Sequence, residues 1–257
     1  MKKGILIVSF GTSHLDTLEK TIQVIEKDAA EKFPAYGVYR AFTSTVIIRK
    51  LKKTCGFFVD TVEEALKRMA ADGIEEVIVQ PTHIINGIEN DAMTESLTRH
   101  RGMFRRLCTG KPLLSSVDDY KKAVHAVMTQ TELAEDEVLV LMGHGTDHHA
   151  NSAYPTLEYT FHALGYAQVL VGTVESFPEL KNVMSGLKAS GKKKAVLMPF
   201  MLVAGDHAKN DMAGEEDSWK IRLEEEGYQV RTILKGLGEF EGIRKIFLEH
   251  IEEADAG

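Results

Sequence analysis

The chain has 257 residues, of which 44% are hydrophobic and 27% are charged. This length holds one large domain or two lobes of about 130 residues each, and the composition is typical of a globular enzyme. The formal net charge of −7 argues against a broad nucleic-acid-binding surface. The two cysteines, Cys55 and Cys108, are too few for a disulfide framework or a paired-cysteine metal site.

No apolar stretch approaches the roughly 20 residues that a membrane-spanning helix needs. The N-terminal MKKGILIVSF places two lysines before an apolar stretch, as a signal peptide does. This stretch is short, however, and it runs into an amphipathic helix without a cleavage site. We interpret it as a first β-strand and expect a cytoplasmic protein with no membrane partner.

Strands and helices alternate along the chain, as judged from apolar runs and helical spacing. In the N-terminal half we predict strand 4–10, helix 16–32, strand 37–42, helices 45–53 and 61–72, strand 75–80, helix 90–107, strand 112–115 and helix 117–129. The polar stretch TQTELAEDE follows and suits a boundary between lobes of residues 1–130 and 131–257.

The C-terminal half repeats the alternation. We predict strand 137–142, helix 150–163, strand 167–172, helix 179–189, strand 193–199, helix 208–226, strand 228–233 and helix 240–253. This pattern indicates an α/β fold of two similar, doubly wound lobes, each with a parallel sheet covered on both faces. Right-handed crossovers bring the loops after the strands to one edge, so we expect an active site in a cleft between the lobes.

The two halves also repeat one another in sequence. ILIVSFGTS (5–13) aligns with LVLMGHGTD (139–147) at an offset of 145 − 11 = 134, and VIVQPTHIINGIEND (77–91) aligns with AVLMPFMLVAGDHAK (195–209) at an offset of 118. In this alignment Phe10 corresponds to His144, and Glu89 corresponds to His207. A duplicated frame with imidazole and carboxylate groups in its loops predicts a site that handles protons or a metal.

Three predicted strands of the C-terminal half are each followed by a residue of a metal-ligand type. These residues are His144, which lies between two glycines, Glu175 and His207. Two imidazoles and a carboxylate are a recurring ligand set for divalent cobalt, nickel, iron or zinc. Taken singly, each could be a loop residue without a ligand, and Asp206 and Asp211 beside His207 could simply cap a helix.

The N-terminal half offers further candidates at its own strand ends. Glu89, as the counterpart of His207, could face the same ligand, whereas His83 could equally be structural. Thr12 and Ser13 precede a helix, where free backbone N–H groups suit an anionic group, although ordinary helix caps look the same.

Three further observations concern the lining of the site and the class of ligand. Met201 follows a strand of the C-terminal half and could line an apolar wall, whereas His148 and His149 are interpreted as the start of a helix. Neither a GxxxxGK[ST] nor a GxGxxG pattern is present, so no nucleotide is expected.

These residues lie in stretches that resemble a known family. The chain is similar to the CbiK-type anaerobic sirohydrochlorin cobaltochelatases of the class II chelatase family. The resemblance extends from Lys3 to about Gly238 and rests on VSFGTSHLDT, YRAFTSTVIIRKL, THIINGIE, GKPLLSSVDDY, MGHGTDHHANSAY, VESFPE and LMPFMLVAGDHAKNDMAGEEDSWKIRL. It implies two α/β lobes with the active site between them.

The resemblance also implies an activity, the ATP-independent insertion of Co²⁺ into sirohydrochlorin for cobalamin biosynthesis. It implies that His144, Glu175 and His207 bind the metal and that Glu89 lies at the cleft. Two pyrrole protons must leave as the metal enters, and a neutral imidazole suits their removal because its unperturbed pKa is about 6.5. We therefore assign the role of base to His144.

The carboxylates around sirohydrochlorin need hydrogen-bond donors from the protein. The candidates for this role are Thr12, Ser13, Ser44 or Thr45, Arg49 and Lys50, with Lys220 and Arg222 as weaker ones. Each basic side chain could equally belong to a solvated helix face.

Two other functions stay open from the residues alone, and a third is disfavoured. The same ligands would suit insertion of Fe²⁺ or Ni²⁺, because affinity follows the divalent series rather than one metal. A carrier of a tetrapyrrole or a metal could use the same imidazoles without turnover. A structural zinc site is disfavoured by the lack of cysteine pairs. A homo-oligomer and a bound haem are left open.

Overall fold

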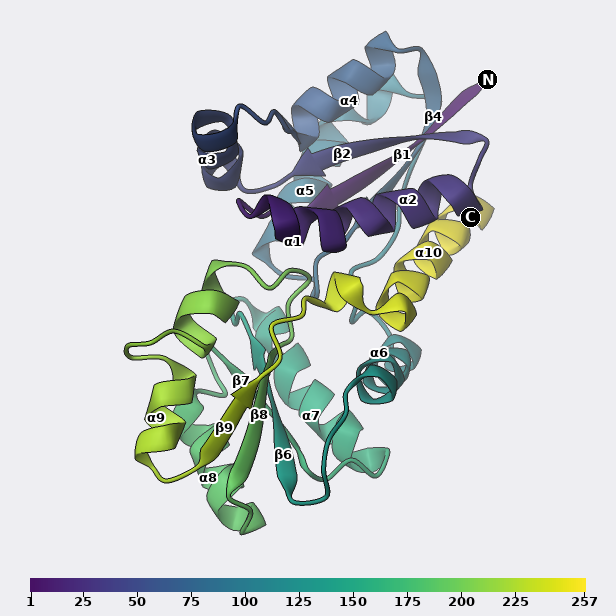
Figure 1. The fold of residues 1–257 in the computed structure, drawn as a ribbon. Coiled ribbons are helices and arrows are strands. Elements are labelled where there is room, and N and C mark those ends of the chain that lie inside the picture. Colours follow the sequence, from purple (N-terminus) through teal and green to yellow (C-terminus); the bar gives the residue numbers. More distant parts are fainter. The chain divides into compact units, whose positions relative to one another are not determined.

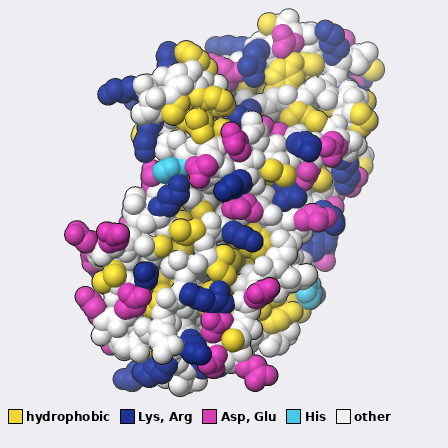
Figure 2. Space-filling model, viewed as in Figure 1, with side chains coloured by type: hydrophobic (Ala, Val, Ile, Leu, Met, Phe, Trp, Pro, Cys, Tyr) yellow, Lys and Arg dark blue, Asp and Glu magenta, His cyan; other side chains and the backbone are white.

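The computed structural model describes residues 1–257, which form two compact units (Figure 1). The first unit comprises Met1–Ser115 and Ile243–Gly257, and the second unit comprises Ser116–Gly242. None of the helices combines the length and the apolar character that crossing a membrane requires. On the face drawn in Figure 2, positive and negative side chains are interspersed.

The first unit contains a five-stranded parallel sheet with the order β3-β2-β1-β4-β5. Its elements are β1 (Lys2–Ser9), α1 (Leu15–Lys20), α2 (Ile22–Lys32), β2 (Tyr36–Phe42), α3 (Thr45–Cys55), β3 (Asp60–Thr61), α4 (Val62–Ala71), β4 (Ile74–Pro81), α5 (Ile88–His100), a 3-10 turn (Arg101–Met103), β5 (Arg106–Thr109) and most of α10 (Glu241–Ala256). Four consecutive residues of β1, Ile5 to Val8, are fully buried. Such a run requires helices on both faces of the sheet.

The second unit contains a four-stranded parallel sheet with the order β7-β6-β8-β9. Its elements are α6 (Val117–Gln130), β6 (Glu137–Gly143), a 3-10 turn (His149–Ser152), α7 (Ala153–Ala163), β7 (Val169–Thr173), α8 (Leu180–Ser190), β8 (Lys194–Pro199), a π-helical turn (Ala208–Met212), α9 (Trp219–Glu225), β9 (Gln229–Thr232) and a 3-10 turn (Leu237–Glu239). Helices α8 and α9 cover one face of this sheet (Figure 1) and pack on Val138, Val140 and Met142 of β6. The predicted class of parallel α/β fold is confirmed.

The internal repeat found in the sequence is a repeat of strand register. In the first sheet Val8 of β1 pairs with Pro81 of β4, and in the second sheet Met142 of β6 pairs with Pro199 of β8. These pairs are related by the same offsets as the sequence alignment, 142 − 8 = 134 and 199 − 81 = 118. The two halves therefore share one backbone frame down to the pairing of single residues.

The predicted helix 16–32 is two helices, α1 and α2, divided at Thr21. The backbone of Thr21 leaves the helical region with φ −124° and ψ −84°, and its hydroxyl donates to the carbonyl of Thr17 at 2.6 Å. A threonine side chain that bonds to its own helix competes with the backbone ladder, which explains the break.

The predicted helix 90–107 and strand 112–115 are both corrected. The helix ends at His100, and residues Arg106–Thr109 form edge strand β5, which pairs with β4. Phe104 and Leu107 are spaced as on a helix, yet both pack on the core of the sheet. Residues 112–115 lie outside the sheet, where the amide of Leu113 donates to the carbonyl of His83 at 2.9 Å.

The predicted helix 208–226 is also corrected. It consists of the π-helical turn, an irregular segment over 213–218, and the short helix α9. Asp217 adopts a positive φ of 50°, which an α-helix cannot contain. Ser218 then begins α9 by accepting a hydrogen bond from the amide of Ile221 at 3.3 Å.

The two compact units differ from the predicted lobes in two segments, residues 116–130 and residues 243–257. Helix α6 packs against α7 and belongs to the second unit, whereas residues 243–257 of α10 belong to the first. Arg106 binds the carboxylate of Asp255 at 3.0 Å, and Arg244 binds Asp28 at 2.6 Å. These ion pairs join residues that are far apart in the chain, so no local pattern could predict them.

Candidate metal centre

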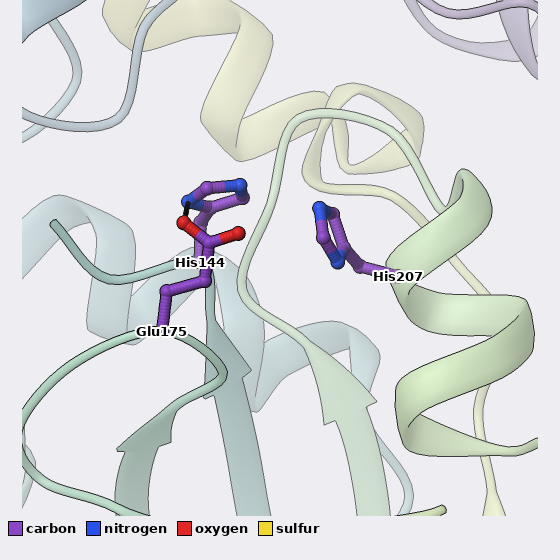
Figure 3. A group of neighbouring side chains, drawn as sticks. All are labelled: His144, Glu175 and His207. Atoms are coloured by element: carbon purple, nitrogen blue, oxygen red, sulfur yellow. Dashed lines mark ion pairs between the residues drawn. The ribbon is translucent and has the colours of Figure 1, made fainter.

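Three side chains meet at the carboxyl edge of the second sheet. They are His144, directly after β6, Glu175, two residues after β7, and His207, in the loop after β8. One ligand atom from each lies within 4.8 Å of the others. Figure 3 shows the ring of His144 and a carboxylate oxygen of Glu175 directed toward the ring of His207. Since β7, β6 and β8 are adjacent strands, the sheet order alone brings these loops together.

The loop of His144 depends on its two glycines. A side chain at Gly143 would come within 2.2 Å of the ring of Tyr154, which lies against the backbone there. Gly145 has a positive φ of 86°, and a Cβ at this position would lie 2.9 Å from the amide nitrogen of Ser176. Glycine on each side of His144 therefore lets the chain make this turn without strain.

The hydrogen bond of His144 determines which ring nitrogen is free. Nδ1 lies 2.9 Å from the carbonyl oxygen of Gly145, and a carbonyl only accepts, so Nδ1 carries the proton. Nε2 then offers its lone pair to a ligand. Glu175 Oε2 lies 3.6 Å from Nδ1, where a carboxylate would stabilise a protonated ring.

Glu175 is held by a tight turn after β7. Its amide donates to the carbonyl of His144 at 2.9 Å, and the hydroxyl of Thr173 donates to the carbonyl of Ser176 at 2.6 Å. The backbone is thus fixed while the carboxylate stays 54% exposed. An exposed carboxylate on a fixed turn is free to bind a cation.

His207 immediately precedes the π-helical turn. Its ring packs edge-on against that of His144, with centroids 4.7 Å apart and an interplanar angle of 90°. Its Nδ1 lies 2.8 Å from Oδ2 of Asp211. The sequence interpretation treated Asp211 only as a helix cap, although its spacing of four residues from His207 was a signal of this contact.

The hydroxyl candidates of the first unit already take part in turns. The hydroxyl of Thr12 is buried and accepts from the amide of His14 at 3.2 Å, and that of Ser44 caps α3 by accepting from Ile47 at 3.3 Å. Ser13 is half-buried in the same loop as Thr12, and Arg49 is exposed on α3.

Glu89 and His83 follow β4 in the first unit. Glu89 is half-buried in the first turn of α5. His83 is buried, and the side chain of Asn90 interacts with its ring. Burial lowers the pKa of His83 to about 4, so the ring is neutral near pH 7.

Met201 and the histidine pair lie in the second unit. Met201 packs against the core of the second unit. His148 accepts a hydrogen bond from the amide of Ala150 at 3.2 Å. His148 and His149 start a 3-10 turn, as the sequence predicts. Neither belongs to the group of His144, Glu175 and His207.

Comparison with known proteins identifies the family of the chain. The sequence model of the cobalt chelatase (CbiK) family matches residues 3–256. The chain belongs to the CbiK family of cobalt chelatases. It is 44% identical to the sirohydrochlorin cobaltochelatase of Salmonella typhimurium, over 99% of this chain and 97% of that protein.

A second relative and a solved structure complete the comparison. The chain is 35% identical to the sirohydrochlorin cobaltochelatase CbiKC of Nitratidesulfovibrio vulgaris, over 98% of this chain and 90% of that protein. The structure of SirB from Bacillus subtilis with Fe³⁺ superposes with a TM-score of 0.70 at 16% identity, covering 100% of this chain and 96% of that one. This likeness supports the same fold and the predicted class II chelatase architecture.

Proposed function

We propose that this protein inserts Co²⁺ into sirohydrochlorin without a nucleotide and releases cobalt-sirohydrochlorin, a step of cobalamin biosynthesis. The observation that carries the proposal is the convergence of His144, Glu175 and His207 in a chain of the CbiK family. The activity in the names of the two relatives supports it.

The metal is a substrate that the three side chains hold before transfer. Two imidazole nitrogens and a carboxylate oxygen are ligands that divalent cobalt accepts, and they offset the loss of its water ligands. His144, Glu175 and His207 are 43%, 54% and 38% exposed. A hydrated ion can therefore reach all three from solvent.

Insertion also needs a base, because Co²⁺ replaces two pyrrole protons of the macrocycle. We assign this base to His144, whose Nε2 lone pair is free while Nδ1 is bonded to Gly145. Once the metal has passed to the ring nitrogens, Nε2 can accept one pyrrole proton, and the second proton passes to water at this exposed site. Glu175, 3.6 Å from Nδ1, stabilises the imidazolium that results.

We assign the binding of the macrocycle to residues that follow strands of the two units and to Arg49 on α3. They are Thr12, Ser13, Ser44, Arg49, His83, Glu89 and Met201. Arg49 and the loop amides near Thr12 offer donors to the substrate carboxylates, and Met201 offers apolar surface. We also retain the predictions that the protein works in the cytoplasm and that it needs no nucleic-acid or membrane partner.

The test is an anaerobic assay in which a catalytic amount of enzyme is mixed with sirohydrochlorin and Co²⁺, Fe²⁺ or Ni²⁺ while the absorption spectrum is followed. We expect multiple turnovers that are fastest with Co²⁺. Faster turnover with Fe²⁺ or Ni²⁺ would change the assigned metal. A spectral change limited to one equivalent of enzyme would make the protein a tetrapyrrole carrier and overturn the proposal.

A further inference from the structure

Asp211 contacts a metal-ligand side chain, and the function above leaves it without a role. Its Oδ2 lies 2.8 Å from Nδ1 of His207. An ionised carboxylate only accepts hydrogen bonds, so Nδ1 of His207 carries the proton and Nε2 carries the lone pair. The contact thus selects the nitrogen that His207 can offer to a metal.

The π-helical turn fixes both partners of this contact. Ala208 and Met212 are fully buried in the core of the second unit. His207 directly precedes Ala208, and Asp211 directly precedes Met212. The turn that buries Ala208 and Met212 therefore leaves His207 and Asp211 in contact with solvent. π-helical turns are rare and frequently lie at functional sites, and here the turn holds a carboxylate beside a metal-ligand histidine.

The two histidines of the centre have different partners. Nδ1 of His144 donates to the neutral carbonyl of Gly145, whereas Nδ1 of His207 donates to the carboxylate of Asp211. A carboxylate partner fixes the ring orientation and makes the other nitrogen a stronger metal ligand. By this difference His207 is the firmer ligand, and His144 is freer to exchange a metal for a proton.

We propose that Asp211 is a positioning residue that orients His207 and strengthens its bond to Co²⁺, so that His207 holds the ion until its transfer to the macrocycle, after which His144 acts as the base. This inference rests on the proposed function for the identity of the ion. It concerns the capture of the metal rather than the binding of the macrocycle.

The test measures Co²⁺ binding to the free protein by visible absorption under anaerobic conditions, in the absence of sirohydrochlorin. Asp211→Asn replaces the carboxylate with a neutral amide of the same shape, and Asp211→Glu restores the charge. Glu216→Gln is the matched control, because it removes one charge from an exposed position of the neighbouring segment. Both His207 and Asp211 reach solvent, so the contact contributes little to stability and the variants should fold.

We expect Asp211→Asn to weaken Co²⁺ binding by about 10- to 100-fold, the usual effect of removing such a partner. Asp211→Glu should recover most of the affinity, and Glu216→Gln should keep that of the wild type. In turnover assays the KM for Co²⁺ should rise while the KM for sirohydrochlorin stays unchanged. An Asp211→Asn variant that binds Co²⁺ as tightly as the wild type, or no more weakly than Glu216→Gln, would overturn the inference.

These outcomes separate the inference from the proposed function. If the wild type binds Co²⁺ in an Asp211-dependent manner but never inserts it, the chelatase assignment fails and the role of Asp211 stands. If turnover occurs and Asp211→Asn leaves both the affinity and the KM for Co²⁺ unchanged, the chelatase assignment stands and the role of Asp211 fails.

Discussion

The loops after β1 and β2 in the first unit and those after β6 and β7 in the second have one backbone design and different chemistry. In the first unit the amide of Ser44 donates to the carbonyl of Phe10 at 3.2 Å. In the second unit the amide of Glu175 donates to the carbonyl of His144 at 2.9 Å. The same connection thus carries an exposed phenyl ring and a hydroxyl in one unit, and an imidazole and a carboxylate in the other.

This difference shows that the backbone of these loops forms without the metal-binding side chains. The backbone bonds at the strand ends form equally well with Phe10 or His144. Gly11 and Gly145 have positive φ angles of 105° and 86°, so the glycine is what both turns share. The side chain just before this glycine is free to change, so His144 occupies a position that contributes little to folding.

The largest expected effect comes from the pair Phe10 and His144. We expect His144→Ala to lower the kcat for Co²⁺ insertion by about 100-fold or more, because a positioned general base contributes 10²–10⁴-fold. The KM for sirohydrochlorin should change little. Phe10→Ala, at the equivalent position, should leave kcat within about threefold of the wild type, since no base is lost. Steady-state kinetics of the two variants measure the contrast, and equal losses of kcat would refute it.

The next effect concerns His83, whose equivalent in the second unit is Met201. The pKa of His83 lies at about 4 in the folded protein, below the ordinary value of 6.5, because the ring is buried. On acidification the unfolded chain therefore binds the proton first, and the native state loses stability as the pH falls from about 6.5 to 4. The full loss is about 3 kcal/mol.

His83→Met should remove this dependence by placing the residue of the second unit in the first. Urea unfolding of the wild type and the variant between pH 7 and pH 4 measures it. Parallel stability curves over this range would show that His83 does not titrate as its burial implies.

A smaller effect is expected at the two glycines of the shared turn. Gly11→Ala and Gly145→Ala both place a side chain at a positive φ, and the new Cβ would lie 2.5 Å from the ring of Phe42 or 2.9 Å from the amide of Ser176. Each should cost about 1–3 kcal/mol of stability. Thermal unfolding measures the common loss. Metal titration should then distinguish the two, because only Gly145→Ala displaces a metal ligand.

The smallest effect concerns Ser44 and Glu175. Ser44→Ala removes the cap of α3 and should lower the free energy of unfolding by about 1 kcal/mol. Glu175→Ala removes an exposed side chain and should change stability by less than about 0.5 kcal/mol, yet weaken Co²⁺ binding. Denaturant unfolding and metal titration on both variants test this division. A stability loss at Glu175 as large as that at Ser44 would contradict it.

Much of the fold is readable from the sequence because its signals are local. Apolar runs such as Ile5 to Val8 predict buried parallel strands, and the paired motifs around Gly11 and Gly145 predict the repeat. The interpretation failed where local spacing was ambiguous. Phe104 and Leu107 fit a helix, but Phe104 lies in the bend before β5 and Leu107 lies in β5. The hydroxyl of Thr21 breaks a helix that the apolar pattern continues.

By itself the sequence determined the parallel α/β class, the duplication, and the ionisable residues that follow the strands, because strand and turn signals act over a few neighbouring residues. The tertiary structure decided which of those residues meet. The order β7-β6-β8 brings His144, Glu175 and His207 together, and the π-helical turn brings Asp211 to His207. It also placed most of α10 in the first unit, where Arg244 pairs with Asp28. Contacts of this kind depend on packing between distant segments, which no local pattern encodes.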